Sequence, residues 1–422
     1  MKKSRRSLLA LLLVVVMAVL TACGSTTAGT TANTAANTAS GTAANTTAAA
    51  NTTANASASN TTTAAAAGPE DNVIKIGVIC SMTGGNAVYG QGAQNAVTLA
   101  AQEINAAGGK YTVEILNGGN VADDATNSTT AVNAYNSLLP ENPEAIVGSF
   151  FSSVTLPMAE LANKSGMLLL AAGATNYKVT QIGPTIFRDC FIDPYQGKMA
   201  AKFASEDLKV KKAAVIYAND DDYSNGLKDA FIENAKADGI DVVYTGECTT
   251  KDTDFTAQAS QAVASGADFV FYPCFLDTVP LLVQQLRDAG FTGSIMGGDG
   301  WDGADTSGLE SDFDNCYFTN HYSSEDTAPA VQDFVKKYTD TYGTDTLNAC
   351  AALYYDAIYM LVKAAENGGG TDTASLVKGM TGMTFTGVGG TFTMDQNGDP
   401  AKSVVINTYK DGKIKWLKTL EP

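Results

Sequence analysis

The feature that most constrains the fold is a repeated alternation between short, continuous apolar runs and longer amphipathic stretches, which begins near residue 73. Residues 73–79 form the first apolar run, and positions 93, 97, 100 and 104 then place apolar side chains on one face of a helix. Continuous apolar strands separated by amphipathic helices predict parallel sheets with helices on both faces. Further strands are expected at residues 111–116, 145–148, 167–171, 213–217, 241–244, 268–272 and 293–296, and further helices at 124–139, 155–164, 255–264, 328–341 and 348–366.

The patterned part of the chain is about 350 residues long, which is too much for one ordinary hydrophobic core. The alternation therefore predicts two doubly wound α/β lobes joined by a hinge. The chain closes with apolar runs at 404–409 and 414–417 around an Asp411-Gly412 turn, which is typical of a β-hairpin.

The N-terminus has the organisation of an export signal. Lysines and arginines at positions 2–6 precede an apolar stretch at 8–20, which is too short for a stable membrane span. The stretch ends in Leu20-Thr21-Ala22-Cys23, which resembles the lipobox of bacterial lipoproteins. We expect residues 1–22 to be a signal peptide and Cys23 to carry lipid; the alternative is an ordinary secretory signal with a chance cysteine.

Residues 24–69 consist almost only of Ala, Thr, Asn, Ser and Gly, so residues 23–71 are expected to form an acylated, disordered stalk. The whole chain has a formal charge of −17, and removal of the four cations in the leader makes the mature form more negative still. Such a charge would repel a phosphate backbone, and we expect no nucleic-acid partner.

The body has six cysteines, and no two lie within four residues of each other. The close pairs of zinc and redox motifs are therefore absent, while disulfides and buried free thiols both remain open. The six are Cys80, Cys190, Cys248, Cys274, Cys316 and Cys350.

The sequence contains few residues or motifs that are typical of catalysis or cofactor binding. The single histidine, His321, is interpreted as a surface or structural residue. Residues 298–303 fit Gly-x-Gly-x-x-Gly, but the stretch after them does not predict the helix that a dinucleotide site needs. The acidic run at 220–222 lacks the spaced ligands of a calcium loop. We expect neither an enzyme nor a cofactor or metal.

Ligands of open α/β sheets bind beyond the carboxyl ends of the strands, and four loops at such ends carry suitable groups. Residues 149–153 offer hydroxyl groups and free N–H groups at a helix start, which favour a carboxylate, and residues 171–175 offer another hydroxyl and an exposed carbonyl. Residues 219–226 and 297–301 offer aromatic and acidic side chains. Among these, Asp299 on its glycine-flanked turn is suited to an ammonium group.

With these loops in place, the chain resembles the substrate-binding proteins of bacterial ABC importers, of the branched-chain amino acid (leucine/isoleucine/valine) type. The resemblance covers about residues 73–417. It rests on Ile76-Gly77-Val78, Thr83-Gly84-Gly85, Tyr89-Gly90-Gln91-Gly92, residues 101–109, Tyr223-Ser224-Asn225-Gly226, Asp252-Thr253-Asp254-Phe255, Gly298-Asp299-Gly300 and Leu353-Tyr354-Tyr355-Asp356-Ala357. It implies the type I periplasmic-binding (Venus-flytrap) fold, with residues 72–190 and 321–395 in lobe I and residues 191–320 and 396–422 in lobe II.

The resemblance also assigns roles to residues. It places the carboxylate-binding serine at Ser152, and the carbonyl and hydroxyl that hold the head group at Gly173 and Thr175. The closing aromatic falls on Tyr223, and the acidic residue that takes the ammonium falls on Asp299, where Glu is common. Tyr89 matches a pocket-lining aromatic of the first lobe, and a pocket residue of the second lobe falls near Phe275 or Leu276.

Two departures from the family concern the side-chain pocket. Phe151 stands where leucine-type proteins have a disulfide cysteine, and Trp301 is expected to reach the pocket. The resemblance implies a non-catalytic, membrane-anchored binder that delivers an amino acid to an ABC permease and its ATPase subunits. The alternatives are a sensor or receptor of the same fold, and a binder of amides or urea.

Overall fold

The computed structural model describes residues 72–421, so the signal peptide, Cys23 and the stalk predicted for residues 1–71 lie outside the described residues. The strands are β1 (Val73–Cys80), β2 (Thr112–Ile115), β3 (Ala122–Asp123), β4 (Ala145–Val147), β5 (Leu168–Ala171), β6 (Ile186–Arg188), β7 (Lys212–Ala218), β8 (Asp241–Cys248), β9 (Phe269–Phe271), β10 (Ser294–Gly297), β11 (Cys316–Asn320), β12 (Thr384–Gly387), β13 (Gly390–Thr393), β14 (Val404–Lys410) and β15 (Lys413–Leu420). The helices are α1 (Ala87–Ala107), α2 (Leu116–Gly119), α3 (Ser128–Leu138), α4 (Ser152–Ser165), α5 (Lys178–Gln181), α6 (Asp193–Glu206), α7 (Asp222–Ala237), α8 (Thr256–Ala264), α9 (Val279–Asp288), α10 (Pro329–Tyr342), α11 (Ala349–Gly368) and α12 (Thr373–Met380), with short 3-10 turns at Leu139–Glu141 (η1) and Asp299–Trp301 (η2).

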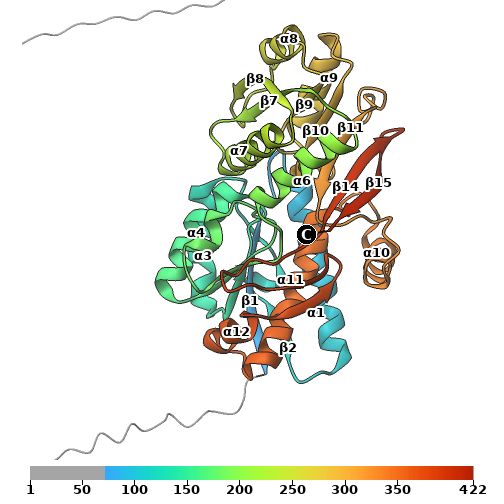
Figure 1. The fold of residues 1–422 in the computed structure, drawn as a ribbon. Helices are drawn as coiled ribbons and strands as arrows, with labels where there is room; N and C mark the ends of the chain where they lie inside the picture. The colour runs from blue at the N-terminus through green and yellow to red at the C-terminus, as the bar shows by residue number, and fades with distance from the viewer. Residues whose placement is uncertain (1–71, 422) are drawn as a thin grey trace, which may run out of the picture. The chain divides into compact units, whose positions relative to one another are not determined.

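The first sheet is wholly parallel and has the order β2-β1-β4-β5-β6, with β3 paired to the end of β1. The order runs outward from β1 in both directions, so right-handed crossovers place helices on both faces. Helix α1 packs against α11, and α3 packs against α4. Figure 1 shows α1 and the α3–α4 pair on either side of β1. This is the first doubly wound lobe that the sequence predicts.

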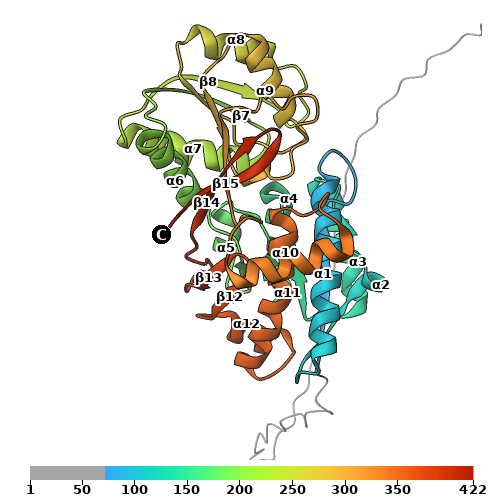
Figure 2. The same cartoon turned by 90° about the vertical axis from the view of Figure 1, so that its right-hand side faces the viewer.

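The second sheet has the order β15-β14-β11-β10-β9-β7-β8. Its members from β8 to β11 are parallel, whereas β14 and β15 are antiparallel to their neighbours. The two last strands form the hairpin predicted at the end of the chain, and Figure 2 shows them in red. The second lobe is therefore a mostly parallel sheet with an antiparallel edge, and the predicted fold class is confirmed.

The chain passes between the two sheets three times. It leaves the first sheet after β6, and it leaves the second sheet after β11 to form α10, α11 and α12, of which α10 and α11 pack against α1. It then returns to the second sheet as β14 and β15. The lobe boundaries at residues 190, 320 and 395 stay a prediction.

Some elements differ from the sequence-based expectation. Helix α3 begins at Ser128, four residues later than predicted, because the Asn127 side chain accepts hydrogen bonds from the N–H groups of Thr129 and Thr130 and so caps the helix there. The strands β11, β12 and β13 are not predicted, because each is short and lacks a continuous apolar run. All six cysteines of the body are buried free thiols.

Candidate ligand-binding site

The hydroxyl-bearing loops of the first lobe meet at the carboxyl ends of β4 and β5, which are neighbours in the sheet. Ser152 opens α4, is almost fully buried, and its Oγ accepts a hydrogen bond from the N–H of Asn176 at 3.1 Å. Thr175 follows β5; its Oγ1 is buried and has no hydrogen-bond partner among the described residues. The Ser152 hydroxyl keeps its proton free to donate, so this corner of the molecule offers two hydroxyl groups to an anion.

Gly173, two residues before Thr175 in the loop after β5, has a backbone conformation that requires glycine. Its φ is 110°, and a Cβ placed there would lie 2.3 Å from the ring of Phe150. The ring therefore rests directly on the Gly173 backbone, in the loop whose carbonyl is expected to contact the ligand.

In the second lobe, Tyr223 and Asp299 come together from two different strand ends. Tyr223 lies in the first turn of α7, whose start is fixed by Asp221, which accepts a hydrogen bond from the Ser224 N–H. The Tyr223 hydroxyl accepts a hydrogen bond from the N–H of Gly300 at 3.3 Å. Asp299 follows β10 and is 1% exposed. The predicted aromatic and acidic groups are thus neighbours.

Two side chains that sequence analysis did not assign to the site hold the Asp299 carboxylate. Gln196 of α6 donates from Nε2 to Oδ1 at 2.7 Å, and His321 Nε2 lies 3.1 Å from Oδ2. His321 is buried rather than on the surface, and its ring stacks on Phe191 with centroids 3.9 Å apart. Burial lowers the pKa of His321, so the ring is neutral at neutral pH and acts as a donor to Asp299.

Tyr89 connects the two lobes. It lies on α1 and is fully buried, and its hydroxyl donates to the carbonyl of Gly300 at 2.9 Å. The approach of α1 depends on the next residue, Gly90, because a Cβ there would lie 2.1 Å from the carbonyl oxygen of Ser81. The Tyr-Gly pair therefore brings a tyrosine hydroxyl of the first lobe to the Asp299 turn of the second.

Five aromatic rings, here called the aromatic cluster, form a continuous set of contacts between the lobes. Neighbouring ring centroids are 4.5–5.9 Å apart, and no ring is more than 8% exposed. Phe275 touches both Phe151 and Tyr223 and so joins the rings of the first lobe to those of the second. The cluster consists of Tyr89, Phe150, Phe151, Tyr223 and Phe275.

Trp301, which is predicted to reach the side-chain pocket, has its ring in the second lobe. The indole is fully buried in the hydrophobic core of the second lobe, where Nε1 donates to the carbonyl of Tyr272 at 2.9 Å. A Cβ on Gly297 would lie 1.9 Å from that nitrogen, so the ring occupies the space that the glycine leaves. Trp301 therefore turns away from the aromatic cluster and supports the turn that carries Asp299.

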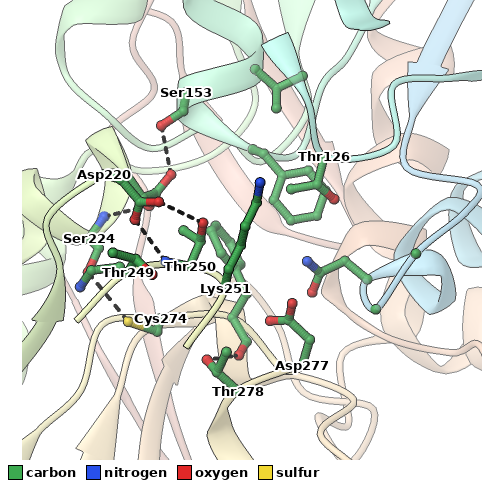
Figure 3. Close-up of a pocket in the computed structure, with 18 of the residues that line it drawn as sticks. Thr126, Ser153, Asp220, Ser224, Thr249, Thr250, Lys251, Cys274, Asp277 and Thr278 are labelled. Atoms are coloured by element: carbon green, nitrogen blue, oxygen red, sulfur yellow. Dashed lines mark hydrogen bonds between the residues drawn. The ribbon is translucent and has the colours of Figure 1, made fainter. Parts of the chain in front are cut away.

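A cleft of about 320 Å³ opens between residues of the two lobes. Thr126 of the first lobe and Lys251 and Asp277 of the second border it, as Figure 3 shows. Phe275 also borders this cleft, whereas the other predicted site residues do not. The buried, predicted groups therefore lie apart from a polar opening.

Ser153 and Asp221 join the lobes at the edge of this cleft. Ser153 Oγ donates to Asp221 Oδ1 at 2.7 Å and accepts from the N–H of Asp222 at 2.7 Å. Burial raises the pKa of Asp221 to about 6, although the Ser153 hydrogen bond lowers it. These two bonds connect the start of α4 to the start of α7.

No helix within residues 72–421 is long and apolar enough to cross a membrane. The same part of the chain contains no group of three or more His, Cys, Asp or Glu side chains arranged to hold a metal ion.

Comparisons with known proteins agree with the fold. Residues 73–413 match the periplasmic binding protein family. A Leu/Ile/Val-binding protein homolog of Brucella melitensis is 29% identical over 353 residues, which are 82% of this chain and 94% of that protein. A Leu/Ile/Val-binding protein of Rhizobium johnstonii is 30% identical over 72% of this chain and 82% of its own length.

Solved structures give the same picture. The leucine-binding protein LivK of Thermotoga maritima is 31% identical with a TM-score of 0.76, covering 83% of this chain and 99% of that one. LivJ of Streptococcus pneumoniae, a branched-chain amino acid transporter substrate-binding protein solved with isoleucine, is 26% identical with a TM-score of 0.74 and covers 83% and 100%. The chain therefore belongs to the periplasmic binding protein family, a family of solute-binding proteins that act outside the cytoplasm.

Proposed function

We propose that this protein captures an α-amino acid between its two lobes and delivers it to an ABC importer. The observation that carries the proposal is the pairing of opposite chemistry across the lobe interface. Ser152 and Thr175 provide hydroxyl groups on the side of the first lobe, and Asp299 provides a buried carboxylate on the side of the second. A zwitterion with adjacent carboxylate and ammonium groups matches such a pair.

The surroundings support this assignment. Phe275 of the second lobe contacts both Tyr223 and Phe151, the residue before Ser152, so the two chemical halves are joined through one ring. The rings of the aromatic cluster are buried, and the low dielectric constant of such surroundings strengthens each charge-assisted hydrogen bond. Relatives named for leucine, isoleucine and valine make apolar amino acids the first ligands to test.

The proposed cycle requires no bond to be made or broken. Closure of the lobes around the amino acid would present the closed form to a permease, and the associated ATPase subunits would supply the energy. An acylated Cys23 would hold the protein at the membrane, and the stalk would separate the lobes from the lipid.

A thermal-shift screen with the twenty L-amino acids, followed by calorimetry on each positive compound, tests the proposal. A ligand that binds the folded state raises the melting temperature by mass action. The expected result is a clear shift with one or more apolar amino acids. Shifts with acetamide or urea, and none with any amino acid, would refute it.

A further inference from the structure

The polar cleft between the lobes begins directly beside the residues that are assigned to the head group of the ligand. Ser153, which follows Ser152, and Ser224, which follows Tyr223, both line this cleft. Consecutive residues are about 3.8 Å apart, so in each lobe the cleft starts about one residue away from the head-group site. Phe275, a member of the aromatic cluster, also borders it. A ligand side chain that extends past this ring would therefore end in the cleft.

The lining of the cleft is polar, which does not suit an aliphatic side chain. Its hydroxyl, amide and charged groups come from both lobes, and Figure 3 shows several of them as sticks. They include Asn86, Thr126, Asp220, Thr250, Lys251 and Asp277. An aliphatic group placed among them would displace water from these groups without replacing its hydrogen bonds. A ligand side chain that reaches the cleft is therefore expected to end in a polar group.

Asn86 carries a buried acceptor for which the described part of the protein has no donor. The residue is 5% exposed, and its Oδ1 has no hydrogen-bond partner among residues 72–421. Asn86 stands at the N-cap position of α1, but its side chain makes no capping hydrogen bond there. A buried amide oxygen without a donor is costly, so a donor supplied by the ligand would stabilise the closed form.

Asp277 of the second lobe sets the orientation of the Asn86 amide. Burial raises the pKa of Asp277, and a hydrogen bond from the Asn86 side chain lowers it. A carboxylate only accepts hydrogen bonds, so the amide nitrogen of Asn86 faces Asp277 and the amide oxygen is left without a donor. Asp277 also packs against Gly85 in the loop before α1, where a Cβ would lie 2.8 Å from the Asp277 Cβ. The closed form therefore brings two acceptors, Asn86 Oδ1 and the Asp277 carboxylate, together at the lining of the cleft.

We propose that the ligand is an α-amino acid whose side chain ends in a carboxamide, with glutamine as the first compound to test. A carboxamide has two N–H donors and one carbonyl acceptor. Its donors match Asn86 Oδ1 and the Asp277 carboxylate, and its carbonyl matches the ammonium group of Lys251, which borders the same cleft. A carboxylate terminus would bring no N–H donor to the two acceptors, and a cationic terminus would meet the positive charge of Lys251. The inference rests on the proposed function and narrows its ligand class.

Calorimetry of the wild type with L-glutamine, L-norleucine, L-glutamate and L-lysine tests the assignment. L-norleucine has a side chain of similar length without polar atoms, so L-glutamine should bind at least about tenfold more tightly, the effect of about one or two neutral hydrogen bonds. L-glutamate has nearly the shape of L-glutamine but only acceptors at its end, and L-lysine has only donors. Both should bind more weakly than L-glutamine.

Asn86→Leu removes the amide at nearly constant size. The contact between positions 86 and 277 is lost for every ligand alike, so the informative quantity is the ratio of L-glutamine to L-norleucine affinity. This ratio should fall about fivefold or more, because only L-glutamine loses a hydrogen bond. Ser128→Ala is the matched control: Ser128 also lines the cleft, but its hydroxyl already donates to the carbonyl of Ser153 at 2.9 Å. The control should keep the wild-type ratio.

A second variant, Asp277→Asn, covers the case in which Asn86→Leu does not fold. With an amide at position 277, the Asn86 side chain can turn either its nitrogen or its oxygen toward the ligand, and the negative charge is gone. The ratio of L-glutamine to L-glutamate affinity should therefore fall. An unchanged ratio in either folded variant, or a wild type that binds L-norleucine, L-glutamate or L-lysine as tightly as L-glutamine, would overturn the inference and leave the proposed function intact. A wild type that binds no amino acid would overturn both.

Discussion

Replacement of Ser153 by alanine should weaken ligand binding, although Ser153 is not one of the predicted ligand-binding residues. The Ser153 hydroxyl makes two 2.7 Å hydrogen bonds across the edge of the cleft, one to the Asp221 carboxylate and one from the N–H of Asp222. A bond to a charged group contributes about 1.5–3 kcal/mol and a neutral one about 1 kcal/mol. Ser153 is only half-buried, so water replaces part of both bonds. We expect a net loss of about 1–2 kcal/mol.

The two lost hydrogen bonds stabilise the closed conformation, in which the two lobes are in contact. A loss of about 1–2 kcal/mol in the closed form lowers the apparent affinity roughly 5- to 30-fold, because the ligand must offset the less favourable closure. Most of the change should appear as faster dissociation. Calorimetry and stopped-flow dissociation of the amino acid found in the thermal-shift screen would measure both quantities.

Ser128→Ala is the matched control for this prediction. The Ser128 hydroxyl donates to the carbonyl of Ser153 at 2.9 Å, so it is a neighbouring serine whose hydrogen bond stays within the first lobe. Its removal should leave the dissociation rate within about twofold of the wild type. Equal dissociation rates for the wild type and Ser153→Ala, or an equal increase in both variants, would show that the contact across the cleft does not stabilise the closed form.

Three further predictions concern other groups. Phe150→Leu replaces the ring that stacks on Tyr89 at 4.5 Å and rests on Gly173 with a smaller side chain. The change should raise the affinity for leucine relative to alanine and lower the free energy of unfolding by about 1 kcal/mol. An unchanged ratio of leucine to alanine affinity in calorimetry would contradict it. Burial lowers the pKa of His321 from 6.5, so the contribution of the neutral ring to stability is present above pH 6.5 and is lost as the pH falls through the folded-state pKa. Urea titrations from pH 8 to 5 should therefore show a steeper decline in the free energy of unfolding for the wild type than for His321→Gln, and parallel curves would refute this. The buried thiols of Cys80 and Cys350, 3.9 Å apart, should react with Ellman's reagent only after unfolding, and rapid labelling of the native protein would contradict their burial.

The sequence was sufficient for the layers of the fold and for the location of the strand-end loops. Parallel strands place all their carboxyl ends at one edge, so an apolar run followed by a polar loop predicts where Ser152, Thr175 and Asp299 lie. The same reasoning does not give the direction of the Trp301 ring, because position in a loop does not determine where a side chain points. Gly297 leaves a space beside the ring that only the three-dimensional arrangement reveals.

The partners of the candidate site were harder to anticipate than its members. His321 follows β11, a strand of mixed polar and aromatic residues that lacks an apolar run, so its approach to Asp299 has no periodic signal. Gln196 lies within α6, where a polar side chain is also ordinary for a solvent-exposed helix. Their burial depends on contact between elements far apart in the chain, and no local pattern records it.

The chain passes between the two sheets three times, and this affects when each lobe can fold during synthesis. The first sheet acquires α11 as a cover only after β11 of the second sheet has been made, and the second sheet receives β14 and β15 only after α12 and the β12–β13 hairpin have been made. Neither half is therefore complete while the ribosome is still adding residues. A chain that must cross a membrane in an extended state gains from this delay, since the second sheet is completed only when β15 has emerged.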